Sequence, residues 1–198
     1  MRAVEADLSN NLEETMRNVL LSSILFASAA LCAQVAEKPA PAPELVTKFV
    51  KNAAAADKKT IVAFHASWCG WCKRLESYLE MPDIKPIIDK YYSVLWLTVN
   101  ERESNKALEN PGADSFLKKW TNGVNTGIPF YVVLDSKEEV LVSSILPLKP
   151  GDKPGNIGFP GDETERKAFI SFLKIGAPRI TVPEEAALLK GLESIMAK

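Results

Sequence analysis

The chain has 198 residues, enough for one domain with a substantial core and too few for two ordinary ones. It carries 24 Lys and Arg against 25 Asp and Glu, a formal net charge of −1, and the basic residues are scattered among the acidic ones. Because proteins that bind a phosphate backbone usually show a basic surplus or basic clusters, this balance argues against nucleic acid as a partner.

Residues 1–33 show a pattern typical of a secretory signal peptide. Arg17 stands before an apolar run at 19–31, and small residues close the run up to Ala33. The run is shorter than the roughly 20 apolar residues that span a membrane, whereas its length and flanks fit a cleaved signal. We therefore expect a periplasmic or secreted protein that is not membrane-spanning after processing.

The four acidic residues within residues 1–15 do not fit the positively charged start of a signal peptide. We interpret Met16 as the true start of translation and residues 1–15 as a spurious extension. An ordinary N-terminal helix is the alternative. Cys32 suggests a lipid anchor, but Leu31 stands where a lipoprotein signal usually has a small residue, and this argues against lipidation.

After the signal, residues 34–43 contain three prolines and predict an extended linker to a folded domain over 44–198. Apolar residues at helical spacing predict a helix over 44–56, and a short apolar run predicts a buried strand over 60–66.

The next elements are a helix over 71–79 and a helical turn or two over 86–91. Residues 93–99 (SVLWLTV) are rich in β-branched and aromatic side chains and predict a second strand. Residues 101–112 are polar and irregular. A helix is expected over 113–121, with three apolar residues on its inner face: Phe116, Leu117 and Trp120.

Two further strands, 130–134 and 140–145, flank an evident hairpin turn at 135–138. Residues 147–161 are rich in Pro and Gly and predict a long loop, which in a compact domain is usually functional or disordered.

Two helices follow this loop. Asp162 with Glu165 predicts a capping box for the first helix, and Thr181 with Glu184 predicts one for the second. The complete order of elements predicts an α/β domain: two strands joined through a helix are parallel, with a right-handed crossover, and the hairpin adds antiparallel strands. The expected architecture is a mixed four-stranded sheet flanked by helices, with an extra C-terminal helix.

The chemistry of the chain is concentrated in residues 68–73 (WCGWCK), which lie between a predicted strand and a predicted helix. Unpaired N–H groups at a helix N-terminus favour an anion, so Cys69 is expected to form a reactive thiolate. Cys69 would attack a disulfide, and Cys72 would resolve the mixed disulfide. Once the signal is removed no other cysteine remains, so the pair serves either reactivity or a local clip.

Two other interpretations of the spacing between Cys69 and Cys72, a zinc site and a haem attachment site, have weaker support. A structural zinc site needs four ligands, and the processed chain offers two cysteines and one histidine. Haem attachment requires histidine after the second cysteine, where Lys73 stands. We expect no metal and no bound cofactor.

Residues 61–73 (IVAFHASWCGWCK), together with Gly127-Ile128-Pro129, resemble the thioredoxin family over roughly residues 44–175. The chain is similar to secreted single-domain thiol–disulfide oxidoreductases of this family, several of which have a CGWC motif. The resemblance implies the thioredoxin fold, exchange with protein thiols or disulfides, and a cis Pro129 that faces the cysteines and, with Ile128, shapes the substrate groove. An ordinary proline at the start of a strand is the alternative.

The sequence departs from the family pattern at several positions. Ala63 stands at the place of a buried aspartate, no lysine occurs in 95–99, Ser77 replaces a proline, and Trp71 occupies a position inside the motif that is usually proline or histidine. Deprotonation of Cys72 during resolution must therefore use water or another group.

His65 and Glu76 are the two candidates for that group. His65 shares a strand face with Ala63, and histidine, with an unperturbed pKa near 6.5, exchanges protons at neutral pH. Glu76 follows Cys72 by one helical turn. We hypothesise that His65 tunes the thiol. The alternative for His65 is a half-buried histidine that packs as an aromatic side chain would, and the alternative for Glu76 is an ordinary solvated side chain.

Three further residues of the motif are expected to support the site. Trp68 and Trp71 should form a rim on the substrate groove, and Lys73, with Arg74, should raise the local positive potential, mostly screened by solvent. The loop at 147–161 should border the groove and influence the choice of partner.

The leading interpretation is an enzyme that exchanges a Cys69–Cys72 dithiol or disulfide with protein substrates. The alternatives are a thioredoxin-fold chaperone or peptide-binding module with a structural disulfide and, last, a metal carrier. A membrane redox partner is one way to recharge the pair. The sequence does not decide between reductase, oxidase and isomerase.

Overall fold

The computed structural model describes residues 38–124, 126–147, 151 and 153–196. The predicted signal peptide, Cys32 and residues 34–37 of the predicted linker lie outside these residues. None of the helices in the described part combines the length and the hydropathy that a membrane crossing requires.

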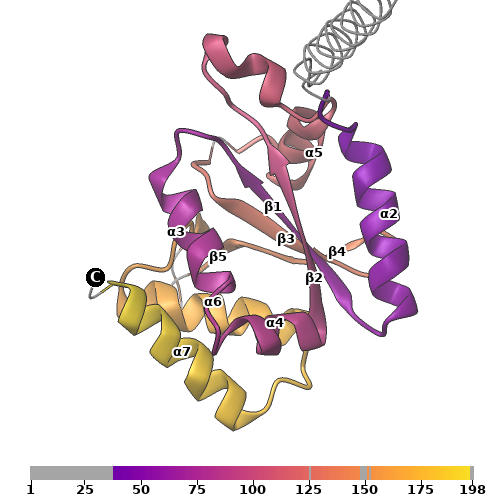
Figure 1. Ribbon diagram of the computed structural model, residues 1–198. Coiled ribbons are helices and arrows are strands. Elements are labelled where there is room, and N and C mark those ends of the chain that lie inside the picture. The colour runs from indigo at the N-terminus through magenta and orange to yellow at the C-terminus, as the bar shows by residue number, and fades with distance from the viewer. Residues whose placement is uncertain (1–37, 125, 148–150, 152, 197–198) are drawn as a thin grey trace, which may run out of the picture. The chain divides into compact units, whose positions relative to one another are not determined.

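A mixed four-stranded sheet lies at the centre, with strand order β2-β1-β3-β4 (Figure 1). β1 is parallel to β2 and antiparallel to β3, and β3 is antiparallel to β4. The strands are β1 (Lys59–His65), β2 (Tyr92–Thr98), β3 (Phe130–Leu134) and β4 (Val140–Ser143). This confirms the mixed sheet predicted from the order of elements.

Helices cover both faces of the sheet. They are α2 (Ala42–Ala55), α3 (Gly70–Leu79), α4 (Lys85–Tyr91), the 3-10 helix η1 (Glu103–Leu108), α5 (Ala113–Trp120), α6 (Glu163–Gly176) and α7 (Val182–Met196). Buried residues of α2 and α5 share one core with Val62 and Phe64 of β1, whereas α3, α4, α6 and α7 share a second core with Ile61 and Ala63. The alternation along β1 therefore places α3, which follows the first cysteine, and the C-terminal helix on the same face.

The start of the domain differs slightly from the prediction. α2 begins at Ala42, two residues earlier than expected, because proline is tolerated in the first helical turn and Pro43 is accommodated there. The backbone N–H of Ala42 donates to Pro111 O at 2.8 Å, which attaches this helix start to the connection before α5.

The second half of the hairpin is interrupted, so the prediction of one strand over 140–145 is wrong. β4 ends at Ser143, and Ile145–Leu146 forms β5, which pairs antiparallel with β6 (Gly155–Asn156) in a separate two-stranded sheet. The cause is Ser144, which is fully buried: its N–H donates to Tyr131 O at 2.8 Å and its Oγ accepts from the N–H of Tyr131 at 3.1 Å. Residues 155–156 of the predicted loop are thus a short strand.

The helix ends agree with their capping signals to different degrees. At α6, Asp162 and Glu165 form the complete capping box that was predicted. At α7, the Glu184 carboxylate accepts from the N–H and the hydroxyl of Thr181, so only Glu184's half of the predicted box is present.

Candidate active site

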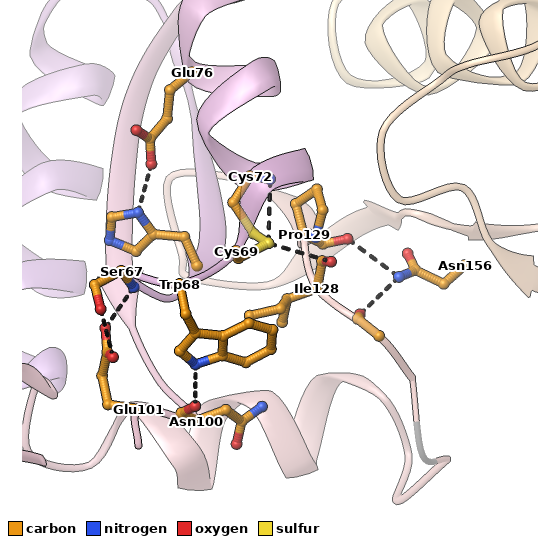
Figure 2. The surroundings of a disulfide bond; sticks show 12 residues. Ser67, Trp68, Cys69, Cys72, Glu76, Asn100, Glu101, Ile128, Pro129 and Asn156 are labelled. Atoms are coloured by element: carbon orange, nitrogen blue, oxygen red, sulfur yellow. Dashed lines mark hydrogen bonds and ion pairs between the residues drawn. A yellow bond between two sulfur atoms is a disulfide. The ribbon is translucent and has the colours of Figure 1, made fainter. Parts of the chain in front are cut away.

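Cys69 and Cys72 form a disulfide at the N-terminus of α3 (Figure 2). Cys69 is the N-cap residue, with extended backbone, and its Sγ accepts a hydrogen bond from the Cys72 N–H at 3.1 Å. Cys69 is 4% exposed, whereas Cys72 is fully buried. Only Cys69 can therefore meet a substrate sulfur, and an N–H donor already points at the atom on which thiolate charge would develop.

The segment Gly127-Ile128-Pro129 lies directly opposite the disulfide. The peptide bond between Ile128 and Pro129 is cis, and the Ile128 carbonyl oxygen lies 3.6 Å from Cys69 Sγ. Ile128 also packs against the small cluster of Ala66, Cys69 and Cys72. In the reduced protein, a Cys69 thiol could donate to this carbonyl, and a client residue bonded to Cys69 would lie beside this segment.

Two tryptophans flank the disulfide and are exposed despite their size, Trp68 at 46% and Trp71 at 54%. Trp68 Nε1 donates to Asn100 O at 2.8 Å, which fixes that ring (Figure 2). Trp71 stacks on Phe159 with ring centroids 5.5 Å apart. Both rings present apolar area beside the disulfide.

A cavity of about 360 Å³ adjoins Trp71. Its walls come from the segment opposite the disulfide and from the loop after β5, and its lining includes Ile128, Pro129, Ile157 and Phe159. The long loop therefore does border the space next to the cysteines, through its described part.

The basic residues of the motif are at the surface. Lys73 is exposed, and the Arg74 guanidinium lies 5.6 Å from the centre of the Trp71 ring, within cation–π range. Arg74 Nη1 also contacts the sulfur of Met196 at 3.9 Å, so α7 reaches the edge of this site.

The two proton-exchange candidates contact each other. His65 Nδ1 lies 2.5 Å from Glu76 Oε1, and Nε2 lies 3.1 Å from Thr98 Oγ1. Among the described residues, no hydrogen bond joins His65 to either sulfur. His65 is thus linked by its side chain to α3 through Glu76 and to β2 through Thr98.

Ala63, at the place of the family's buried aspartate, is itself buried and is the register partner of Trp96 on β2. The apolar side chains packed around the two sulfurs are those of Ala66 and Ile128. The described residues include no group of three metal-ligating side chains that could hold an ion.

Two polar residues that the sequence did not single out support the site. Glu101 is 5% exposed, and its carboxylate accepts from the N–H and the hydroxyl of Ser67, two residues before Cys69. Asn156 bonds to the carbonyls of Gly127 and Pro129. No sequence pattern marks these two residues as part of the site, because Glu101 lies in the polar stretch 101–112 and Asn156 lies in the Gly- and Pro-rich loop 147–161.

Comparisons with known proteins agree with this architecture. Residues 42–114 match the family model described as Thioredoxin. This segment contains β1, both cysteines and β2, and Pro129 lies beyond it. A search of curated proteins found no match.

Several solved structures resemble the chain at low identity. The disulphide isomerase from Xylella fastidiosa Temecula1 is 16% identical, with a TM-score of 0.44, over 83% of this chain and 95% of that one. A DsbH oxidoreductase is 17% identical, with a TM-score of 0.41, over 75% and 93%. A thioredoxin from Thermus thermophilus is 19% identical, with a TM-score of 0.38, over 71% and 91%.

Proposed function

We propose that this chain, whose residues 42–114 match the Thioredoxin family model and whose cysteine pair lies at a helix N-terminus, is a thiol–disulfide oxidoreductase acting on protein thiols or disulfides. The observation that carries the proposal is the difference between the two sulfurs. Cys69 retains solvent access and receives the Cys72 N–H, whereas Cys72 is enclosed. This asymmetry suits an attacking thiol and a resolving thiol.

In the reducing direction, the Cys69 thiolate attacks one sulfur of a client disulfide. A bond forms between Cys69 and that sulfur, and the client's other sulfur leaves as a thiolate. The Cys72 thiolate then attacks Cys69, which releases the second client thiolate and forms the Cys69–Cys72 disulfide. The client gains two electrons and the pair loses two. The oxidising direction is the reverse sequence.

We assign client contact to the surface around Cys69. Trp68 and Trp71 offer apolar area, the cavity beside Ile128 and Pro129 offers a recess, and Lys73 adds exposed positive charge. An extended or unfolded client segment could place its cysteine at Cys69 and its neighbouring side chains on these groups.

The cellular setting belongs to the same proposal. The pattern in residues 1–33 favours export to the periplasm or the medium, where a disulfide persists unless a reductant maintains the dithiol. A redox partner in the membrane would supply or remove the electrons. N-terminal sequencing of the exported protein tests this, and a mature chain that retains residues 1–15 would reject the assignment.

The decisive experiment equilibrates the pair with glutathione buffers and measures its reduction potential by alkylation and mass. A reduction potential of about −270 mV would indicate a reductase. A potential of about −120 to −180 mV would indicate an oxidant or isomerase. Rapid alkylation of reduced Cys69 at mildly acidic pH would support the enzyme. A pair that never equilibrates would instead favour a peptide-binding module with a structural disulfide.

A further inference from the structure

Asn156 connects the loop after β5 to the segment opposite the disulfide. It lies in β6, and its partner in register is Ile145 of β5. Its side-chain Nδ2 donates to Gly127 O at 2.9 Å and to Pro129 O at 3.1 Å. Figure 2 shows this amide nitrogen facing both carbonyls.

The other side of the amide is equally occupied. Oδ1 accepts from Ser144 Oγ at 2.7 Å and from the Gly158 N–H at 3.3 Å. An asparagine side chain has two donor hydrogens and two acceptor lone pairs, so all four are used. Carbonyl oxygens only accept, and this fixes which end of the amide faces the segment.

Asn156 bonds to the carbonyls of Gly127 and Pro129, the residues that precede and follow Ile128 in the chain. Between Gly127 O and Pro129 O lies Ile128 O, which is 3.6 Å from Cys69 Sγ. Asn156 therefore fixes the backbone on both sides of the one carbonyl that faces the reactive sulfur. In a mixed disulfide the client chain is bonded to that sulfur, so it lies against the backbone that Asn156 holds.

We propose that Asn156 is a positioning residue for exchange with protein clients, acting through the backbone of residues 127–129. This inference rests on the proposed thiol–disulfide exchange. It also assigns a role to the two-stranded sheet β5–β6, which carries Asn156. Ser144 orients the Asn156 amide and is itself hydrogen-bonded to Tyr131 of β3. The position of the segment relative to Cys69 is then set by β3 and the loop together.

The sharpest test is Asn156→Asp. A carboxylate keeps the acceptor role toward Ser144 and Gly158 but loses both donors, and it turns an oxygen toward two carbonyl oxygens. We expect the second-order rate constant with a protein disulfide to fall by about tenfold or more, since small displacements of groups that orient a substrate cost at least that much. The rate with hydroxyethyl disulfide, which has no peptide backbone to lie along residues 127–129, should stay close to wild type.

Asn110→Asp is the matched control. Asn110 also joins two backbone segments, because its Oδ1 accepts from the Thr98 N–H at 2.8 Å and its Nδ2 donates to Ala40 O at 3.0 Å, but neither partner is part of the Ile128–Pro129 segment. Asn156→Ala, which loses the donors without adding charge, provides the test if the aspartate variant does not fold.

The inference is overturned if the Asn156 variants slow both substrates equally, if Asn110→Asp shows the same selective loss, or if protein exchange is unchanged. A wild-type protein that reacts rapidly with hydroxyethyl disulfide and with the protein client establishes the exchange independently of Asn156. A wild type that reacts with neither rejects the proposed function and this inference with it.

Discussion

The carboxylate of Glu101 holds Ser67 by two hydrogen bonds, 2.5 Å from its backbone nitrogen and 2.7 Å from its hydroxyl oxygen. The two residues follow neighbouring parallel strands, β2 and β1, and Ser67 is two residues before the cysteine that caps α3. This contact therefore fixes the turn that presents Cys69.

Glu101→Gln should lower the free energy of unfolding by about 2 kcal/mol, because a hydrogen bond to a buried charged group contributes about that much and the new amide N–H₂ would face a donor. Denaturant unfolding measures the change. Glu103→Gln, at an exposed position nearby, is the control and should be close to neutral. Equal stability of the two variants would show that the Ser67–Glu101 contact does not stabilise the turn.

Cys72→Ser should accumulate a mixed disulfide between Cys69 and a client, because the attacking thiol remains and the resolving thiol is gone. Cys69→Ser should accumulate none, since Cys72 is fully buried. Non-reducing electrophoresis after incubation with an unfolded disulfide-containing protein separates the two outcomes. Trapping by both variants alike would mean that the roles are not divided as proposed.

His65→Phe should slow exchange at neutral pH by roughly tenfold, less than a base in direct contact with a thiol supplies, because His65 bonds to Glu76 and Thr98 instead of to a sulfur. At alkaline pH, where thiols ionise without help, the variant should match wild type. Glu76→Gln should show the same pattern, and Glu80→Gln, at the exposed end of α3, should not. A flat ratio of rates across pH would assign His65 a packing role alone.

Gly191→Ala should destabilise the domain by up to about 2 kcal/mol, because overpacking usually costs about 1–3 kcal/mol and the better helix propensity of alanine offsets about 1 kcal/mol of it. A Cβ at this position of α7 would lie 2.6 Å from Ile84 Cδ1 and 3.1 Å from Tyr78 Cε2. Ile84→Val removes the nearest carbon, so the double variant should recover part of the loss in denaturant unfolding. Additive effects would contradict the close contact.

Acid should destabilise the protein in part through Glu184. Hydrogen bonds from Lys90, Thr181 and Tyr91 lower the pKa of this carboxyl from 4.5 to about 2. A carboxyl whose pKa is lower in the folded state stabilises the fold above pH 4.5, and this contribution is lost as the pH falls toward 2. Glu184→Gln should lower Tm at pH 7 by about 2–4 °C and flatten the fall in Tm between pH 4.5 and 2. Glu193→Gln, exposed on the same helix, should keep the wild-type slope.

Much of the fold follows from local patterns. The β-branched run of β2, the apolar run of β1 and the capping box of Asp162 with Glu165 each act within a few residues, so the sequence predicts them well. The break at Ser144 was missed because it depends on Tyr131 and Asn156, each 12 or 13 residues away.

The residues of the site also differ in whether a local sequence signal identifies them. The cysteine motif and Pro129 were recognisable from their neighbours in sequence, whereas the support from Glu101 and Asn156 depends on tertiary contacts with Ser67, Gly127 and Pro129. The pairing of His65 with Glu76 has no local signal for the same reason, because only the packing of α3 on β1 brings the two side chains together.

The bond between Cys69 and Cys72 closes a ring of minimal length, since the two cysteines are three positions apart. In the chain-entropy description, a cross-link across four residues restricts the unfolded chain by only about 2 kcal/mol, less than half of what a hundred-residue loop provides. The two large cores that flank the sheet contain neither sulfur. Opening this bond therefore costs the fold less than the loss of a long-range disulfide would, and neither large core contains an atom that changes its bonding when the pair is reduced or oxidised.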